Sequence, residues 1–281
     1  MPTREPLDAL TVRKRLYPEA GQTGGDDQAE CEERRHPWLK QQAPTDKPLL
    51  RLWDWASGSQ PDESGMRAYA SRKRLDTAGT REKTLAQHIY YGNKEPTPYI
   101  SFTSLPKAIE KLARRRDTNK NRGPHRLVAI NPGVRRAKGL PVLDVGAEME
   151  HYGIEDPYCD SDYYENHYAC LWEVTPEEIV GQWTWKKLMK NNKEDWYKEI
   201  VLPAFQQHNN AFTKRSEPTD VGGPDESGRA AALSRESSIP CWTFGSVARL
   251  MVSKLAHPIH AFCHDADPFG QDRVYRSDEE I

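Results

Sequence analysis

Short apolar runs with aromatic and β-branched members recur along the middle of the chain. The clearest lie at Leu49–Trp53, at Tyr99–Thr103 and at residues 127–130. Side chains of these kinds pack well on a pleated surface, so each run predicts a β-strand. Residues 163–172 alternate in polarity and residues 177–185 close the series, which predicts two further strands. The middle of the chain is therefore expected to form a sheet.

Helical spacing follows the second predicted strand. In residues 106–116, Ile109, Leu112 and Ala113 fall on one face of a helix and basic residues fall on the other. Ser104 stands where an N-cap side chain would precede this helix. Because one helix is followed by several strands, we expect an α+β unit whose sheet is mixed or antiparallel.

Composition divides the chain into three parts. Residues 1–44 are rich in charge, glycine, proline and glutamine, which predicts a disordered arm. Residues 45–190 contain the predicted strands and form the expected domain, and residues 191–281 form a C-terminal helical extension. Within that extension, the polar residues 213–238 predict a mobile linker. Helices are expected on either side of the linker, at residues 194–205 and 244–255.

Charge and cysteine content narrow the classes of function. The 281 residues include 42 acidic and 40 basic ones, for a formal net charge of −2. No whole-protein field attracts nucleic acid or an anionic membrane, and the basic run at residues 114–116 is expected to be a solvated face. No apolar run approaches the roughly 18 residues that span a bilayer, and the N-terminus lacks a secretory apolar core. Five scattered cysteines without a paired CxxC spacing agree with a reducing, intracellular and cytoplasmic location.

Three separated motifs carry candidate chemistry. Arg51 lies in Leu-Leu-Arg-Leu-Trp-Asp on the first predicted strand, and Ser101 and Thr103 lie in Tyr-Ile-Ser-Phe-Thr-Ser-Leu on the second. Glu165 and His167 lie in Tyr-Glu-Asn-His-Tyr-Ala-Cys-Leu on a later strand. In this order the motifs resemble those of the arginine-directed ADP-ribosyltransferases, the branch of the heat-labile and cholera enterotoxin A chains. An uncharacterised fungal family with an Arg-x-Trp-Asp start and an Ile-Ser-x-Thr-Ser middle is also similar.

The resemblance covers about half of the chain and implies an NAD-binding fold, with a split mixed or antiparallel sheet and flanking helices. It makes NAD the substrate and implies that Arg51 offers its planar fork to a phosphate or ribose. The alternative for Arg51 is a solvent-facing position on an edge strand. Ser101 would orient the catalytic side chains, and His88, Thr103 and Tyr99 would also bind NAD. His88 belongs to a Leu-Ala-Gln-His segment that resembles a histidine-containing loop of the family.

The Glu-x-His pair departs from the family pattern. On a strand, two residues at this spacing point to the same face. The resemblance implies that Glu165 deprotonates an acceptor guanidinium, and it places His167 at the ribose, where the toxins carry a second glutamate that stabilises the oxocarbenium ion. A neutral imidazole has no negative charge, and loss of one such stabiliser lowers the rate on the order of a hundred- to a thousandfold. A protonated imidazole would place like charge beside the cation.

Three outcomes therefore stay open for the reaction: slow transfer, transfer through Glu165 in a shifted register, or loss of transfer. The leading hypothesis is an enzyme that cleaves NAD and passes ADP-ribose to a guanidinium of a protein or small molecule, to another nucleophile, or to water. One alternative is an inactive or repurposed module that binds NAD or a partner protein. Another is a small-molecule tailoring enzyme that reuses the same pocket.

Two other groups of side chains deserve comparison with these motifs. Residues 257–265 gather three histidines, a cysteine and an aspartate, which are zinc ligands, but Pro258 and the lack of a second ligand pair favour a loop, so no metal is expected. Tyr90 and Tyr91 are further candidates to pack against the nicotinamide ring. The sequence has no GxGxxG or GxxxxGK(S/T) loop, so NAD would bind in the transferase manner.

Overall fold

The computed structural model describes residues 7–17, 36, 38, 43–90, 95–118, 122–158, 164–191 and 195–216. The strands are β1 (Leu49–Trp53), β2 (Met66–Arg67), β3 (Tyr99–Thr103), β4 (Arg126–Ile130), β5 (Val142–Asp144), β6 (His167–Leu171), β7 (Glu173–Val174) and β8 (Ile179–Thr184). The helices are α1 (Ala9–Leu16), α3 (Ala78–Ile89), α4 (Pro106–Asp117), α5 (Pro132–Ala137), α6 (Val145–Tyr152), α7 (Trp185–Asn191) and α8 (Leu202–Ser216). A 3₁₀ turn, η2 (Pro176–Glu178), and a π-helical turn, η3 (Tyr197–Val201), complete the described elements.

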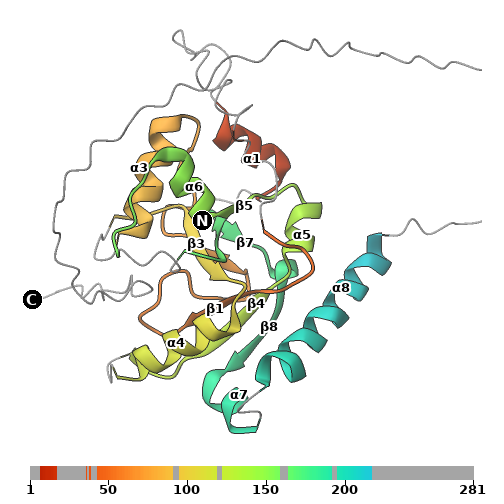
Figure 1. Cartoon of the computed structure of the whole chain (residues 1–281). Helices are drawn as coiled ribbons and strands as arrows, with labels where there is room; N and C mark the ends of the chain where they lie inside the picture. Colours follow the sequence, from red (N-terminus) through yellow and green to blue (C-terminus); the bar gives the residue numbers. More distant parts are fainter. Residues whose placement is uncertain are drawn as a thin grey trace, which may run out of the picture. The chain divides into compact units, whose positions relative to one another are not determined.

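Six strands form one sheet in the order β5-β6-β3-β1-β4-β8 (Figure 1). Every neighbouring pair in it is antiparallel. Strands β2 and β7 form a separate antiparallel pair. The prediction of an α+β unit is confirmed, and of the two expected kinds of sheet, mixed or antiparallel, the structure has the antiparallel one. Strand β1, which carries Arg51, lies in the interior of the sheet and not at its edge.

The sheet opens between β1 and β3. β1 pairs with β4 along five residues and β3 pairs with β6 along five, but within these described strands β1 meets β3 at one residue pair, Leu50 with Thr103. The ladder does not continue toward Arg51 and Ser101. Because successive side chains of a strand point to opposite faces, groups from both faces of the sheet can reach this opening.

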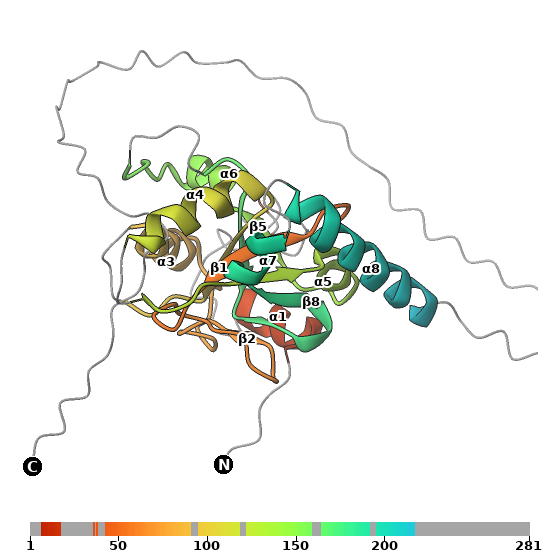
Figure 2. The same cartoon turned by 90° about the horizontal axis from the view of Figure 1, so that it is seen from below.

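Helices α3 and α4 pack on one face of the sheet and the β2–β7 pair packs on the other; in Figure 2, α3, α4 and α6 lie on one side of β1 and β2 lies on the opposite side. On the helical face, α4 and α7 pack over β1 and β4, with apolar contacts from Leu50, Leu52, Leu127 and Ala129. Helices α1, α3 and α6 pack over β3 and β6, with contacts from Tyr99, Ala169 and Leu171. Nearly every residue of β1, β3 and β6 is buried, so the alternating side chains of these strands distribute the core over both faces.

The N-terminal segment contains a helix where a disordered arm was expected. Helix α1 begins after Asp8, whose carboxylate accepts from the Thr11 backbone N–H at 2.7 Å. Val12 and Leu16 are buried in the core beneath it, and Arg15 Nη1 donates to the Ser71 carbonyl oxygen at 2.7 Å. The few apolar residues of this segment are at helical spacing, and tertiary burial compensates for its polar composition.

Three predicted boundaries also need correction. β6 begins at His167 and not at residue 163, because Asn166 has a φ of 58°, which an extended strand excludes. Because η2 precedes it, β8 starts at Ile179. Leu105, and not Ser104, is the N-cap of α4, and the Ser104 hydroxyl donates to Asn166 Oδ1 at 3.1 Å.

The C-terminal part is described as far as Ser216. Helix α8 runs beside β8 in both views (Figures 1 and 2), and Asn131 Nδ2 donates to Asn209 Oδ1 at 3.3 Å. The helix predicted at residues 194–205 is a π turn followed by α8, which continues past the start of the predicted linker. The helix expected at residues 244–255 and the histidine-rich run at 257–265 lie outside the described residues. No helix in the described part of the chain is long and apolar enough to cross a membrane.

Candidate functional site

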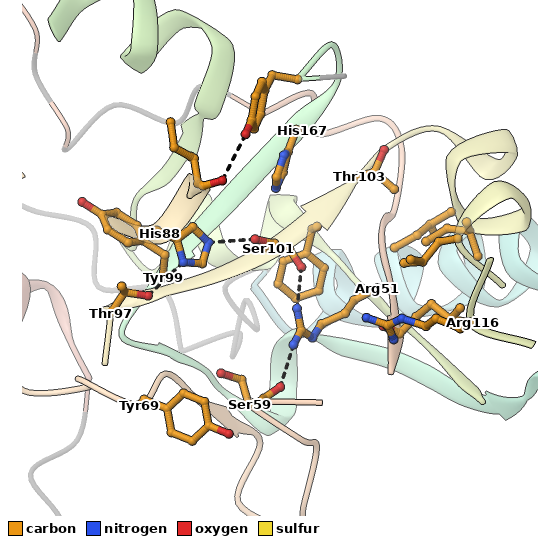
Figure 3. Close-up of a pocket in the computed structure, with 18 residues that line it drawn as sticks. Arg51, Ser59, Tyr69, His88, Thr97, Tyr99, Ser101, Thr103, Arg116 and His167 are labelled. Atoms are coloured by element: carbon orange, nitrogen blue, oxygen red, sulfur yellow. Dashed lines mark hydrogen bonds between the residues drawn. The ribbon is translucent and has the colours of Figure 1, made fainter. Parts of the chain in front are cut away.

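A hollow lies where β1 and β3 separate, and we call it the β1–β3 hollow (Figure 3). Its empty space is about 780 Å³ when the open mouth is included, and the centre of a water molecule can lie in only about 60 Å³ of it. Its inner part is therefore narrow. The hollow brings together six residues that the sequence motifs identified: Arg51, His88, Tyr99, Ser101, Thr103 and His167.

Arg51 crosses the opening between the two strands. Its Nη1 donates to the Ser101 carbonyl oxygen at 3.1 Å, and its Nη2 donates to the Gly58 carbonyl oxygen at 2.6 Å. These bonds span β1, β3 and the loop after β1, so they fix the plane of the guanidinium in the wall of the hollow. The described lining contains no carboxylate. A positioned guanidinium in such a wall is suited to an anionic or polar ligand.

A chain of hydrogen bonds links Ser101 to α3. The Ser101 hydroxyl lies 2.8 Å from Nε2 of His88, and Nδ1 of His88 lies 2.8 Å from the Thr97 hydroxyl (Figure 3). His88 is buried on the last turn of α3, where the resemblance implied a loop. The interpretation of its segment as a loop is therefore corrected. Tyr99 lies next to this chain, with its hydroxyl 2.9 Å from the Thr84 hydroxyl.

The hydrogen bond between the Ser101 hydroxyl and His88 resembles the contact between a serine nucleophile and a histidine base. Burial, followed by the nearby His167 and Arg51, lowers the pKa of His88 to about 3. A general base works best with a pKa near the operating pH, and Thr97 offers no negative charge to stabilise an imidazolium. His88 therefore holds the Ser101 hydroxyl in place and is a poor base for it.

His167 begins β6 opposite Thr103 and points into the hollow. Its ring stacks on that of Tyr164, with centroids 5.6 Å apart and planes inclined by 7°. Burial, followed by the positive charge of Arg51, lowers the pKa of His167 to about 4. The imidazole is neutral at physiological pH, so the position at which the resemblance implies a glutamate holds an uncharged ring.

Glu165 does not join His167 in the hollow. It precedes β6 in a turn, its side chain is exposed, and it is absent from the described lining. The expectation that Glu165 and His167 share a face required both residues to lie on one extended strand. The left-handed backbone of Asn166 interrupts that strand between them, which corrects the expectation.

Among the other residues in the lining, Tyr69, Thr97, Arg116 and Tyr164 were not singled out as site residues from the sequence. Thr97 and Tyr164 precede β3 and β6, and their contacts with the two histidines depend on tertiary packing. Tyr69 lies at the mouth and is 72% exposed. Arg116 belongs to the run expected to be solvated, yet it is buried. Arg116 Nη1 donates at 3.4 Å to Asp54, the aspartate of the Arg-x-Trp-Asp motif, which is far from it in the sequence.

Other candidate residues lie apart from the hollow. Tyr90 is 61% exposed and is not in the described lining, and Tyr91 lies outside the described residues. Among the residues that the structure describes, no group of three histidine, cysteine, aspartate or glutamate side chains could hold a metal ion.

Comparison with known proteins identifies no relative of the chain. No family model, no curated protein and no solved structure matches the chain. The assignment of a function therefore depends on the residues of the β1–β3 hollow.

Proposed function

We propose that the domain binds NAD in the β1–β3 hollow in the manner of an ADP-ribosyltransferase. One observation carries this proposal: six of the seven site residues implied by the resemblance line a single hollow, although they come from β1, α3, β3 and β6. Residues this far apart in the sequence meet only through the fold. The opening of the antiparallel sheet between β1 and β3 also agrees with a split-sheet fold of that type.

The chemistry of the lining supports a dinucleotide. Arg51 would hold a phosphate or ribose oxygen through its fork, which the Ser101 and Gly58 carbonyl oxygens keep in position. The narrow inner part would take the nicotinamide end, beside the rings of Tyr99 and His167. The remainder of the ligand would extend through the open mouth.

We propose slow transfer as part of the same function, because the described lining offers no carboxylate to an oxocarbenium ion. His167 is neutral and Glu165 lies outside the hollow. ADP-ribose would pass to a guanidinium, another nucleophile or water on the order of a hundred- to a thousandfold more slowly than with a glutamate in place. The same observation favours a second candidate, a binding module that retains NAD without turnover.

Calorimetric titration of the full chain with NAD tests binding. The wild type should bind, and Arg51→Ala should weaken affinity by about tenfold or more, because it removes a charge-assisted contact. Arg126→Ala is the matched control, since Arg126 is also a strand arginine but lies outside the described lining and packs over Trp53. It should change affinity by less than about twofold. Equal NAD affinity in wild type and Arg51→Ala would remove the proposal.

Mass spectrometry of the purified protein tests the alternative of a small-molecule tailoring enzyme. A protein that does not bind NAD but retains another small molecule would favour that alternative.

Labelled NAD separates slow transfer from binding alone. In the first case, the wild type releases nicotinamide slowly, and His167→Glu raises the rate by on the order of a hundredfold. His167→Gln, which adds no charge, serves as the control and should stay near the wild-type rate. No turnover in either the wild type or His167→Glu, with NAD affinity retained, would leave the binding module as the function.

A further inference from the structure

Arg116 is a second arginine in the lining of the β1–β3 hollow. It lies near the end of α4, and its side chain is 3% exposed. Figure 3 shows its guanidinium directed toward the side chain of Arg51. A buried guanidinium requires compensating polar contacts, so the residues around Arg116 define what it can do.

A buried carboxylate fixes Arg116 in this position. Asp54, fully buried just after β1, accepts from Arg116 Nη1 at 3.4 Å, and the same nitrogen donates to the Leu52 carbonyl oxygen at 3.2 Å. Arg122 donates to the same carboxylate, from Nε at 2.9 Å and from Nη2 at 3.3 Å. Asp54 thus contacts two arginines with one negative charge. Arg116 is among the described residues that line the β1–β3 hollow, and Arg122 is not.

The charges around the hollow favour an anion. Its described lining contains two arginines and no carboxylate. The two histidines in the lining add no charge, because burial lowers the pKa of both His88 and His167 well below neutral pH. In a partly enclosed space, where water screens charges less than in bulk, the field of two guanidinium groups acts strongly on a ligand.

We infer that Arg51 and Arg116 form an anion subsite that binds the diphosphate group of a nucleotide ligand. A guanidinium offers parallel N–H donors to a pair of phosphate oxygens, and two such groups in the lining of one hollow match two linked phosphates better than a single carboxylate. The inference rests on the proposed NAD binding for the identity of the natural ligand. Inorganic pyrophosphate carries the same anionic group without the rest of the dinucleotide.

Calorimetric titration of the full chain with inorganic pyrophosphate tests the subsite. The wild type should bind it, and Arg116→Met should weaken binding by about tenfold or more, the loss of one charge-assisted contact. Arg122→Met is the matched control, because it removes an arginine from the same carboxylate but outside the described lining. It should change the affinity by less than about threefold. Equal weakening by both substitutions, or none by Arg116→Met, would overturn the inference.

A second variant keeps the test decisive if Arg116→Met does not fold. Arg116→Lys retains the positive charge beside Asp54 but loses the two-donor fork, so it should weaken pyrophosphate binding by roughly threefold or more. Unchanged binding would contradict the subsite.

Titration with NAD beside pyrophosphate distinguishes this inference from the proposed function. Pyrophosphate binding that depends on Arg116 without any NAD binding would leave the subsite standing and remove the proposed function. NAD binding without pyrophosphate binding would leave the proposed function standing and remove the subsite.

Discussion

Two buried regions of this domain use arginine in different ways. In the first, Arg135 is fully buried on α5 and donates to the carbonyl oxygens of Pro141, Leu171 and Glu173 at 3.0, 2.9 and 2.7 Å. Its Nη1 also donates to the Glu178 carboxylate at 2.8 Å. In the second, the β1–β3 hollow, Arg51 donates to two carbonyl oxygens. None of the described residues that line this hollow is a carboxylate.

The difference separates a structural arginine from one that we propose binds a ligand. Burial alone would lower the pKa of Arg135, but the adjacent Glu178 raises it overall, so the guanidinium stays charged and its donors are directed at protein acceptors. The pair joins α5 to η2 and to the ends of β6 and β7. The hollow instead presents Arg51, which is only partly buried, to a space that is open to solvent, where an anion could meet it.

The largest effect should come from breaking the structural region. Arg135→Ala leaves Glu178 buried without its cation and should lower the free energy of unfolding by about 3–5 kcal/mol. Arg51→Ala, the matched change in the hollow, should lower it by less than about 1 kcal/mol, because Arg51 is only partly buried. Urea unfolding followed by tryptophan fluorescence measures both. Similar losses in the two variants would erase the distinction between the regions.

Acid should destabilise the hollow more than the Arg135 region. The native pKa values of His88 and His167, about 3 and about 4, lie below the usual value of 6.5. The unfolded chain therefore takes up protons first, and stability that is complete above pH 6.5 falls as the pH drops toward 4. The expected loss between pH 7 and pH 5 is on the order of 3 kcal/mol, and His167→Gln should remove about half of it. Urea unfolding at each pH gives the slopes, and identical slopes in the two proteins would refute the assignment.

The Ser101 hydroxyl offers a smaller test of how the hollow is held together. Ser101→Ala deprives the buried Nε2 of His88 of its partner and should lower the free energy of unfolding by about 1–3 kcal/mol. Ser64→Ala removes an exposed hydroxyl that bonds to Asp62 and should change it by less than about 0.5 kcal/mol. Thermal unfolding of both variants makes the comparison. Equal changes would mean that the His88 contact contributes nothing to stability.

Two glycines provide the smallest expected effects, with opposite signs. A Cβ at Gly58 would lie 2.5 Å from a ring carbon of Tyr69, so Gly58→Ala must displace that exposed ring and should cost less than about 1 kcal/mol. A Cβ at Gly79, on α3, meets no atom within 4 Å, so Gly79→Ala should stabilise the helix by about 0.5 kcal/mol. Differential scanning calorimetry resolves the signs. A stabilising Gly58→Ala would show that Tyr69 is not seated against this loop.

Elements that depend on local pattern could be predicted from the sequence. Strands β1 and β3 have the predicted bounds, and α4 extends one residue beyond its predicted end, because runs of apolar residues at a fixed period determine which face is buried. The motifs also identified six residues that meet in the hollow. Their order along the chain supplied this information, since no single motif is specific.

The rest depended on tertiary contacts. His88 was assigned to a loop by its resemblance to a histidine-containing loop, although Leu85 and Ile89 of the same segment are at the helical spacing that α3 buries. Asparagine adopts the left-handed backbone of Asn166 more readily than most residues, but a single asparagine does not establish the turn that separates Glu165 from β6. Arg116 and Asp54 are 62 residues apart, so the burial of one basic residue in a run of three could not be foreseen.

Helix α1 has a practical consequence for anyone preparing this protein. The first 44 residues resemble a dispensable tail, and trimming them is a common step before crystallisation. A truncated protein starting at residue 45 would lose Val12 and Leu16 from the apolar cluster that contains Leu75 and Leu85. The apolar surface exposed by this truncation would promote self-association. Boundaries for expression should therefore begin at or before Leu7, and limited proteolysis should spare α1 in the intact protein.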